Sequence, residues 1–427
     1  MSEPNIIWRK YGLKDNPYFI SPLTVLSEKV PINVFTGREE ETQKLIKLIS
    51  SGSERIFVVG DSGVGKTSFV NFVRTKAREG KFFSPCNEIE INKVMSGQEF
   101  LISTLINIYQ EVKEKSLLLS EDMIKDLGQI HSLTRIVGKE TNELSIINFE
   151  RLKELFKKVV KEIVHPRYKG MILHYDNLDN IEDIENIPKM FGEIRDILLI
   201  DDVTFIFVGN SFLPEDIGYN QRVRQIFHYP PIEISELDLK DIKEILEKRI
   251  KYLASNSESP PDIPHTEEAL KILFDLYKGN IRHILKSLSA CVYDLADTNN
   301  PIEITNSLLI NILVDKVKKD YIDGLTEVEK SILVKMLEFG KPITPTEISK
   351  ITKKKLTNIS ALYLPKLRRK TAIEIIGKEG RNIYYEVRPE IRWLLLEKMK
   401  EKEPKTETKT QIKNFIEKKL TEFTNNK

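Results

Sequence analysis

The sequence predicts an α/β fold: a parallel sheet with helices on both faces, then a small helical lid domain and a C-terminal winged helix-turn-helix. A glycine-rich phosphate-binding pattern lies between a strand and a helix, apolar strands alternate with helical segments, and a helix–helix–helix–hairpin order closes the chain. A chain of 427 residues is too long for one ordinary core. We expect a nucleotide-binding core over 1–235, a lid over 236–320, a winged helix over 321–400, and a charged linker with a short tail helix over 401–427.

Composition excludes several classes of protein. A hydrophobic content of 40% with 30% charged residues is typical of a soluble globular chain. The two cysteines, Cys86 and Cys291, lie far apart and form neither a disulfide framework nor a metal spacing, which favours a cytoplasmic protein. No stretch approaches the roughly 18 apolar residues that a membrane span needs, so no membrane partner is expected.

The phosphate-binding pattern follows an expected strand at 55–60 and opens an expected helix at 66–78. Its glycines allow backbone N–H groups to surround phosphate oxygens, and the helix adds its positive N-terminal end. Lys66 is expected to reach the β- and γ-phosphates, and the Thr67 hydroxyl to bind Mg²⁺. The residues are Gly60, Asp61, Ser62, Gly63, Val64, Gly65, Lys66, Thr67 and Ser68.

A second apolar strand, expected at 169–176, ends in Asp176, which would orient Mg²⁺ through its water shell. The next residue is Asn177, whose amide can orient water but cannot accept its proton. We therefore expect slow hydrolysis unless Asp179 substitutes as the base; alternatively, Asn177 and Asp179 only shape the loop.

Three further polar positions follow in order. Asn210 comes after the strand expected at 203–209 and could hold the γ-phosphate or its water. Arg222 or Arg224 could reach the nucleotide of a neighbouring subunit. Arg282, in a Gly-Asn-x-Arg motif between helical segments, could fold back onto the phosphates. Each arginine taken alone reads as an ordinary surface residue; their order favours the functional interpretation.

The C-terminal module predicts DNA binding. Helices are expected at 325–338, 345–352 and 356–370, although Pro365 should kink or end the third, and strands at 372–376 and 383–387 form a hairpin. From Lys341 to Arg392 there are 13 Lys and Arg against 5 Glu, which favours a polyanionic partner over the alternatives of a solvated surface or a protein contact. The candidate DNA-binding residues are Thr357, Asn358, Ser360 and Lys366 on the third helix, and Lys378 and Arg381 near the hairpin tip.

This order of motifs resembles the AAA+ ATPases, and within them the origin-recognition and replication-initiator branch of archaea that ends in a winged helix. The resemblance implies ATP and Mg²⁺ as ligands, double-stranded DNA as partner, a homo-oligomer on DNA, and a helicase or recombinase as a further partner. It implies that Lys66 and Thr67 are Walker A, Asp176 is Walker B, Asn210 is sensor 1, Arg222 (with Arg224 as the alternative) is the arginine finger, and Arg282 is sensor 2, while Val34, Phe35 and Arg38 bracket adenine.

Two features depart from that branch. Asn177 stands where the family usually has Glu, and the segment 11–19 looks more like AAA+ ATPases of transposition regulators and secretion systems. A target-selecting ATPase of a mobile element or plasmid is therefore the second interpretation. A STAND-type signalling or defence ATPase is the third, against which the Gly-Asn-x-Arg motif argues. A short amphipathic helix at 411–423 is expected without an assigned partner.

Overall fold

The structure is a computed structural model that describes residues 6–26, 30–91, 95–137, 148–178, 186–211, 213–214, 221–256, 260–295, 301–379 and 382–393. The chain forms two compact units. The first unit comprises Met1–Pro261 and Gly279–Lys286, and the second comprises Asp262–Lys278 and Ser287–Lys427. The predicted tail helix at 411–423 lies outside the described residues. The predicted domain boundaries after residues 235, 320 and 400 stay predictions.

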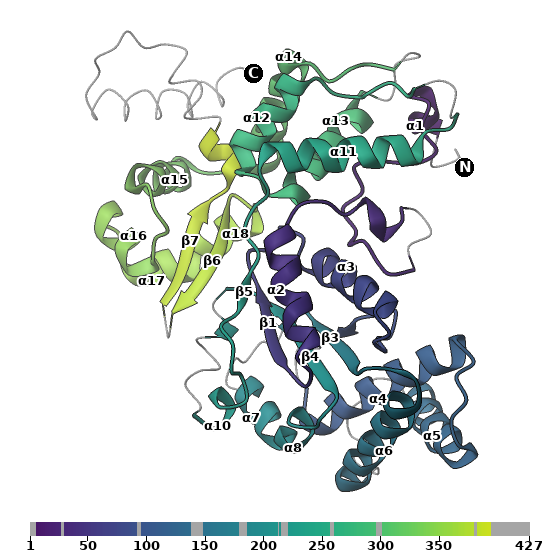
Figure 1. The fold of residues 1–427 in the computed structure, drawn as a ribbon. Coiled ribbons are helices and arrows are strands. Elements are labelled where there is room, and N and C mark those ends of the chain that lie inside the picture. The colour runs from purple at the N-terminus through teal and green to yellow at the C-terminus, as the bar shows by residue number, and fades with distance from the viewer. Residues whose placement is uncertain are drawn as a thin grey trace. The chain divides into compact units, whose positions relative to one another are not determined.

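A parallel five-stranded sheet forms the centre of the first unit (Figure 1). The strands lie in the order β2-β3-β4-β1-β5, and every pair is parallel. Strands β1, β3 and β4 are buried along their whole length, which explains why they appear in the sequence as continuous apolar runs. Their bounds are β1 Arg55–Val59, β2 Ile89–Glu90, β3 Met171–Asp176, β4 Val203–Gly209 and β5 Ile232–Glu233. The α/β class predicted from the sequence is confirmed.

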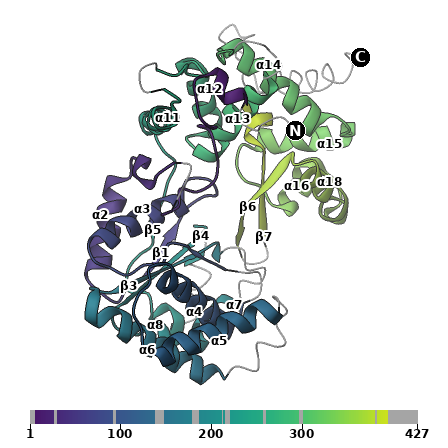
Figure 2. The same cartoon turned by 90° about the vertical axis from the view of Figure 1, so that its right-hand side faces the viewer.

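Helices cover both faces of this sheet, as Figure 2 shows. Alternation along β1 sends Ile56 and Val58 into the core shared with α2 and α3, and Phe57 and Val59 into the core shared with α4 and α6. The helices are α1 Ile6–Lys10, α2 Glu39–Ser50, α3 Lys66–Glu79, α4 Gly97–Glu114, α5 Glu121–Val137, α6 Phe149–Arg167, α7 Asn186–Glu193, α8 Arg195–Leu198, α10 Gln221–Arg224 and α11 Leu239–Leu253, with a 3₁₀ turn at Ile32–Val34. Helices α4 and α5 are separated by a break that contains Ser120.

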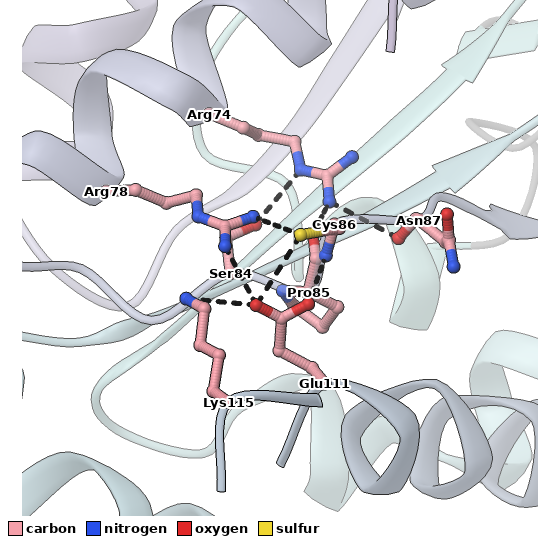
Figure 3. Close-up of polar contacts among 8 residues, drawn as sticks. All are labelled: Arg74, Arg78, Ser84, Pro85, Cys86, Asn87, Glu111 and Lys115. Atoms are coloured by element: carbon pink, nitrogen blue, oxygen red, sulfur yellow. Dashed lines mark hydrogen bonds and ion pairs between the residues drawn. The ribbon is translucent and has the colours of Figure 1, made fainter. Parts of the chain in front are cut away.

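A buried polar cluster fixes helix α3 to its surroundings (Figure 3). Arg74, fully buried, donates to the Ser84 Oγ at 3.0 Å, to Pro85 and Asn87 carbonyls and to the Nδ1 of His174 at 3.0 Å. Arg78 and Lys115 hold the carboxylate of Glu111 at 2.8 and 2.9 Å, and the Cys86 N–H donates to the same carboxylate at 2.6 Å. Because α3 begins at the phosphate-binding loop, this cluster also holds that loop in place.

The carboxylate of Glu111 pairs with two cations of the cluster, Arg78 and Lys115. Burial alone would raise the pKa of its carboxyl, but hydrogen bonds from Lys115 and Cys86 and the charge of Arg78 outweigh it and lower the pKa. Since the pKa is lower in the folded than in the unfolded chain, the stabilisation is present above the unfolded value and is lost as pH falls through the folded one. We expect Glu111→Gln to cost about 2 kcal/mol of unfolding free energy at pH 7.

Urea unfolding measures this cost, and the difference between Glu111→Gln and wild type should shrink as pH falls below about 4. Glu114→Gln, an exposed position on the same helix, is the control and should stay within about 0.5 kcal/mol of wild type. Equal stabilities of the two variants at pH 7 would contradict the assignment.

The second unit contains helices and an antiparallel hairpin. Its elements are α12 Glu267–Tyr277, the last part of α13 Ile281–Asp294, α14 Asn306–Lys316, a π-helical segment Val317–Ile322, α15 Glu327–Phe339, α16 Pro345–Thr352, α17 Leu356–Asn358, a second π-helical segment Ile359–Tyr363, α18 Leu364–Arg369, β6 Ile373–Glu379 and β7 Asn382–Val387. Capping boxes begin α15 and α16, where the side chains of Thr326 and Thr344 accept from the N–H groups of Glu329 and Glu347. From α15 onward the order is that of a winged helix, with one continuous apolar core.

Two details of this module go beyond the sequence prediction. The third helix continues from Leu356 to Arg369, close to the predicted 356–370, so that of the two effects expected of Pro365 it does not end the helix. The π-helical segment before it shifts the hydrogen-bond partners by one residue, so the missing N–H of Pro365 falls where the register changes. Strand β6 extends to Glu379 through an irregularity between Ile375 and Gly377, so that Lys378 lies in the strand opposite Ile383.

Among the described residues, no helix is both long enough and apolar enough to cross a membrane.

Candidate nucleotide-binding site

The loop between β1 and α3 has the conformation that a phosphate cradle requires. Gly60 has φ of 155°, and a Cβ there would lie 2.2 Å from the carbonyl oxygen of Ile234. The Nζ of Lys66 donates to the carbonyl oxygens of Gly60 and Asp61 at 2.8 and 2.9 Å, so the loop curls around its own lysine. Phosphate oxygens are stronger acceptors than these carbonyls, and Lys66 is placed to exchange one for the other.

Thr67 and Asp176, 109 residues apart in the sequence, meet at this loop. The Thr67 hydroxyl donates to the Asp176 Oδ2 at 2.9 Å. Burial raises the pKa of the Asp176 carboxyl to about 6, against the opposing effect of the Thr67 hydrogen bond. A hydroxyl beside a buried carboxylate is a donor set that suits Mg²⁺, because a divalent cation would favour the charged form of the carboxyl. The residues present therefore fit the predicted metal.

Asn177 lines the same cavity and adopts a left-handed backbone, with φ of 59°. Asparagine tolerates this conformation better than most residues. Asp179, the predicted substitute base, lies outside the described residues.

The turn between α12 and α13 approaches the loop from the other side. Asn280 Nδ2 donates to the Ser62 carbonyl at 2.8 Å, and the backbone N–H of Arg282 donates to the Gly63 carbonyl at 3.2 Å. The Arg282 guanidinium reaches the Ser62 Oγ at 3.3 Å. Arg282, predicted from a motif alone, therefore lies at the phosphate-binding loop.

These groups surround a cavity of about 120 Å³. The first of its walls is the loop with Lys66 and Thr67, the second is Asp176 with Asn177, and the third is α13 with Ile281, Arg282 and Leu285. The fourth wall comprises Phe19, Ile20, Ser21, Pro22 and Arg249, which sequence reasoning missed. One signal was available for Arg249: it lies on the buried stripe of α11 that is otherwise apolar, with Ile242, Leu246, Ile250 and Leu253.

Arg249 holds the missed wall in place. Its Nη1 donates to the carbonyl oxygens of Phe19 and Pro17 at 2.9 and 3.3 Å, and its guanidinium lies over the Phe19 ring at 4.1 Å. Burial lowers the pKa of Arg249 to about 10, which leaves it charged at neutral pH. Downstream, the Leu23 N–H donates to the Ser68 Oγ and its carbonyl accepts from Asn71, each at 3.0 Å. Residues 17–23 are thus held at both ends across the cavity.

Three residues predicted to bracket adenine do not line this cavity. Val34 is buried, and Phe35 stacks on Phe72 with ring centroids 4.6 Å apart. Arg38 donates to the carbonyl oxygens of Val64 and Ser235 at 2.8 and 2.7 Å, so it supports the phosphate-binding loop from behind. Their contact with adenine stays a prediction.

Asn210, Arg222 and Arg224 also lie outside the cavity lining. Asn210 follows β4, and its Oδ1 accepts from the Leu213 N–H at 3.0 Å, which caps the next turn. Arg222 and Arg224 are exposed on α10. Their exposure is compatible with a role toward another copy of the chain, as the sequence predicted.

The candidate DNA-binding residues divide into exposed and engaged groups. Thr357, Asn358 and Ser360 are exposed. Lys366 Nζ pairs with the Glu329 Oε1 at 2.8 Å, and only 2% of the Glu329 side chain is exposed, so this lysine neutralises a buried carboxylate of α15. The predicted groove-facing role of Lys366 therefore competes with an ion pair. Arg381 lies outside the described residues.

Cys86, Glu111 and Glu114 offer three ligand atoms within 4.8 Å of one another. Glu111 is already bound by the cations Arg78 and Lys115. A metal ion there would have to displace both cations, so these three residues do not fit a metal site.

Neither a family model nor a curated protein matches this chain. Among solved structures, the chain is similar to the Aeropyrum pernix ORC2 protein in ADPNP–ADP complexes, with a TM-score of 0.51 at 12% identity over 96% of this chain and 100% of that chain. It is also similar to the Aeropyrum pernix ORC1 protein in complex with DNA (TM-score 0.45, 14% identity, 92% and 95% covered) and to Cdc6p from Pyrobaculum aerophilum (0.46, 15%, 96% and 99%).

The likeness to the ORC2 protein is one of fold. Together with the five-stranded parallel sheet and the loop geometry, it identifies the AAA+ P-loop fold with a C-terminal winged helix, the architecture that the sequence resemblance implied.

Gly63 allows the close approach of the Asn280–Arg282 turn. Its φ is 88°, and a Cβ would lie 2.7 Å from the Asn280 Oδ1 and 2.8 Å from the Arg282 Cβ. We expect Gly63→Ala to displace the turn and to lower the unfolding free energy by about 2 kcal/mol more than Gly52→Ala. Gly52 is the control because it also has positive φ, 105°, but nothing lies within 4 Å of its Cβ. Thermal denaturation compares them, and equal losses would contradict the steric argument.

Proposed function

We propose that this protein is an ATP-dependent DNA-binding AAA+ protein of the replication-initiator type, acting in origin recognition or helicase loading, with slow ATP hydrolysis. The observation that carries the proposal is the gathering of Lys66, Thr67, Asp176 and Arg282 around one cavity. These residues supply a phosphate-binding amine, a pair of oxygen ligands for Mg²⁺ and a second cation for the phosphates, which together suit a magnesium-bound nucleoside triphosphate.

Each group has a defined task in nucleotide binding. Lys66 exchanges its two carbonyl acceptors for β- and γ-phosphate oxygens, and the start of α3 adds its N–H groups. Thr67 and Asp176 hold Mg²⁺, which neutralises charge on the phosphate oxygens. Arg282 turns from Ser62 toward the γ-phosphate, so the position of the Asn280–Arg282 turn reports whether that phosphate is present.

Hydrolysis lacks a general base among the described residues of the site. Asn177 orients a water but leaves its proton in place. Arg222, or Arg224, would stabilise the transferring phosphoryl group of a neighbouring subunit, which makes turnover depend on a homo-oligomer assembled on DNA.

The winged helix is the DNA-binding part of the proposal. Its excess of basic residues favours the phosphate backbone, and exposed Thr357, Asn358 and Ser360 favour contacts at base edges in the major groove of a duplex. A target-selecting ATPase of a mobile element or plasmid is the second candidate. One observation favours it: Phe19, the last residue of the segment that resembles transposition regulators, lines the nucleotide cavity. A helicase partner would favour the first candidate and a recombinase the second.

Because different residues are proposed to bind ATP and DNA, a substitution should weaken one of the two affinities and leave the other unchanged. We expect Lys66→Ala to weaken ATP binding roughly 10- to 100-fold and to leave DNA binding without nucleotide unchanged. Arg381→Ala should weaken duplex binding at all sequences, reduce its salt dependence by about one unit of slope, and leave ATP binding unchanged. Fluorescence anisotropy with labelled ATP analogue and labelled duplex measures both affinities.

Exposed lysines in the first unit, Lys44→Ala and Lys125→Ala, are the controls and should change neither affinity. Duplex binding that is absent in wild type, or unaffected by Arg381→Ala and by Lys378→Ala together, would exclude the winged helix as a DNA reader.

If the lack of a general base at position 177 limits hydrolysis, a carboxylate at that position should accelerate it. We expect Asn177→Glu to raise the single-turnover rate of phosphate release by about 100-fold. Because position 177 has a left-handed backbone, Asn177→Asp is the matched variant that keeps tolerance of that conformation while adding a carboxylate. If both variants bind ATP as wild type does and neither hydrolyses it faster, the account of slow turnover is wrong.

A further inference from the structure

A buried polar triad lies in the second unit, apart from the nucleotide cavity lining. The Tyr277 hydroxyl lies 2.8 Å from the Ser287 Oγ and donates to the Glu390 Oε1 at 3.1 Å. Tyr277 is the last residue of α12, Ser287 lies within α13, and Glu390 follows β7 of the winged helix. All three are at least 94% buried, with 6%, 5% and 6% exposure.

The triad brackets the segment that contacts the phosphate-binding loop. Tyr277 and Ser287 stand immediately on either side of Lys278–Lys286, and Gly279–Lys286 belongs to the first unit. That segment contains Asn280 and Arg282, which bond to Ser62 and Gly63. The two ends of the nucleotide-contacting segment therefore bind each other, and one of them, Tyr277, also donates to a carboxylate of the winged helix.

The segment is too constrained to absorb a displacement by itself. A Cβ on Gly279 would lie 2.2 Å from the Leu237 carbonyl oxygen, and the Leu237 N–H donates to the Gly279 carbonyl. The Asn280 side chain also caps the start of α13 through the His283 N–H. A shift of Asn280 and Arg282 must therefore move the residues that follow or precede the turn, which are those of the triad.

Glu390 is poorly compensated for a buried acid. Its Oε2 is buried and has no hydrogen-bond partner among the described residues. The charged and titratable groups that act on its surroundings are Arg388, whose guanidinium lies over the Tyr321 ring at 5.8 Å, the phenol of Tyr321, and Glu374 of β6. A carboxylate with one unpaired oxygen costs stability, since unsatisfied buried polar groups typically cost about 1–3 kcal/mol. Packing of the winged helix alone does not require such a group.

We propose that Tyr277, Ser287 and Glu390 are positioning residues that transmit the nucleotide state from the Asn280–Arg282 turn to the winged helix. The proposal rests on the proposed nucleotide binding. When the γ-phosphate draws Arg282 away from Ser62, the start of α13 moves, the Tyr277–Ser287 contact changes, and the Glu390 hydrogen bond is remade or lost. The winged helix then has two states whose populations nucleotide shifts.

Hydrogen exchange tests the coupling without requiring DNA. The reporters are the N–H groups of Arg388, Ile391 and Arg392, which bond to the carbonyl oxygens of Ala372 and Arg388. We expect a non-hydrolysable ATP analogue with Mg²⁺ to change their exchange rates in the full-length protein by about 5-fold or more. In Tyr277→Phe, which loses only the hydroxyl, the change should fall below about 2-fold while analogue affinity stays that of wild type.

Two further variants separate coupling from stability. Glu390→Met removes the acceptor and the unpaired oxygen together, so it should abolish the exchange response without lowering the melting temperature. Tyr385→Phe is the control, because Tyr385 is a buried phenol of β7 away from the triad, and it should respond as wild type does.

Three results would decide against the proposal. If the analogue binds wild type and the reporters do not respond, the coupling is overturned while the proposed nucleotide site stands. If Tyr277→Phe and Glu390→Met both respond as wild type does, the triad is not the route. If the analogue does not bind at all in a titration, the proposed function and the coupling fall together.

Discussion

The contact between the Ser62–Gly63 peptide and the Asn280–Arg282 turn is the constraint on which the site depends. It exists because Gly63 has no side chain: a Cβ would come within 2.8 Å of both residues. The same contact gives the phosphate-binding loop a roof that is drawn from a different part of the chain. The other contacts of the loop, with Arg38, Ile234 and Asp176, come from its own sheet and the helices beside it, so the Asn280–Arg282 turn is the contact that links the loop to the segment between α12 and α13.

The charges around the cavity explain what it can bind. Lys66, Arg282 and the buried Arg249 face a single described carboxylate of the lining, Asp176, whose pKa is already raised to about 6 by burial. Such a cavity favours an anionic ligand, because three cations face one carboxylate and one of the cations, Arg249, is buried. A triphosphate would bring negative charge to these cations, and Mg²⁺ would add a positive charge beside Asp176. The excess of positive charge in the lining therefore supports the proposed magnesium-bound nucleotide.

Sequence patterns predicted those elements whose formation depends mainly on residues that are neighbours in the sequence. The strand before Gly60, the helix after Gly65 and the capping boxes follow from neighbours in the sequence, and Thr67 met Asp176 because parallel strands end at one edge. The wall at Phe19–Pro22 was missed because it depends on Arg249, about 230 residues away, and no local pattern links the two. The third helix of the winged helix was predicted, but the π-helical segment that absorbs the missing donor of Pro365 was not, because such a register has no simple sequence signature.

In the winged helix, ion pairs distinguish the basic residues that stabilise the module from those that are available to a partner. Lys366 is committed to Glu329 and Arg392 to Glu386, at 2.8 and 2.7 Å, so these cations stabilise the module whether or not a polyanion is present. Lys353, Lys355, Arg368 and Arg369 are exposed and have no ion pair among the described residues. A polyanionic partner would therefore gain most of its binding energy from these four residues, and its affinity would depend on salt through them. Glu390 is buried and has one carboxylate oxygen without a hydrogen-bond partner among the described residues, so it is the acid through which the proposed repositioning of the module would act.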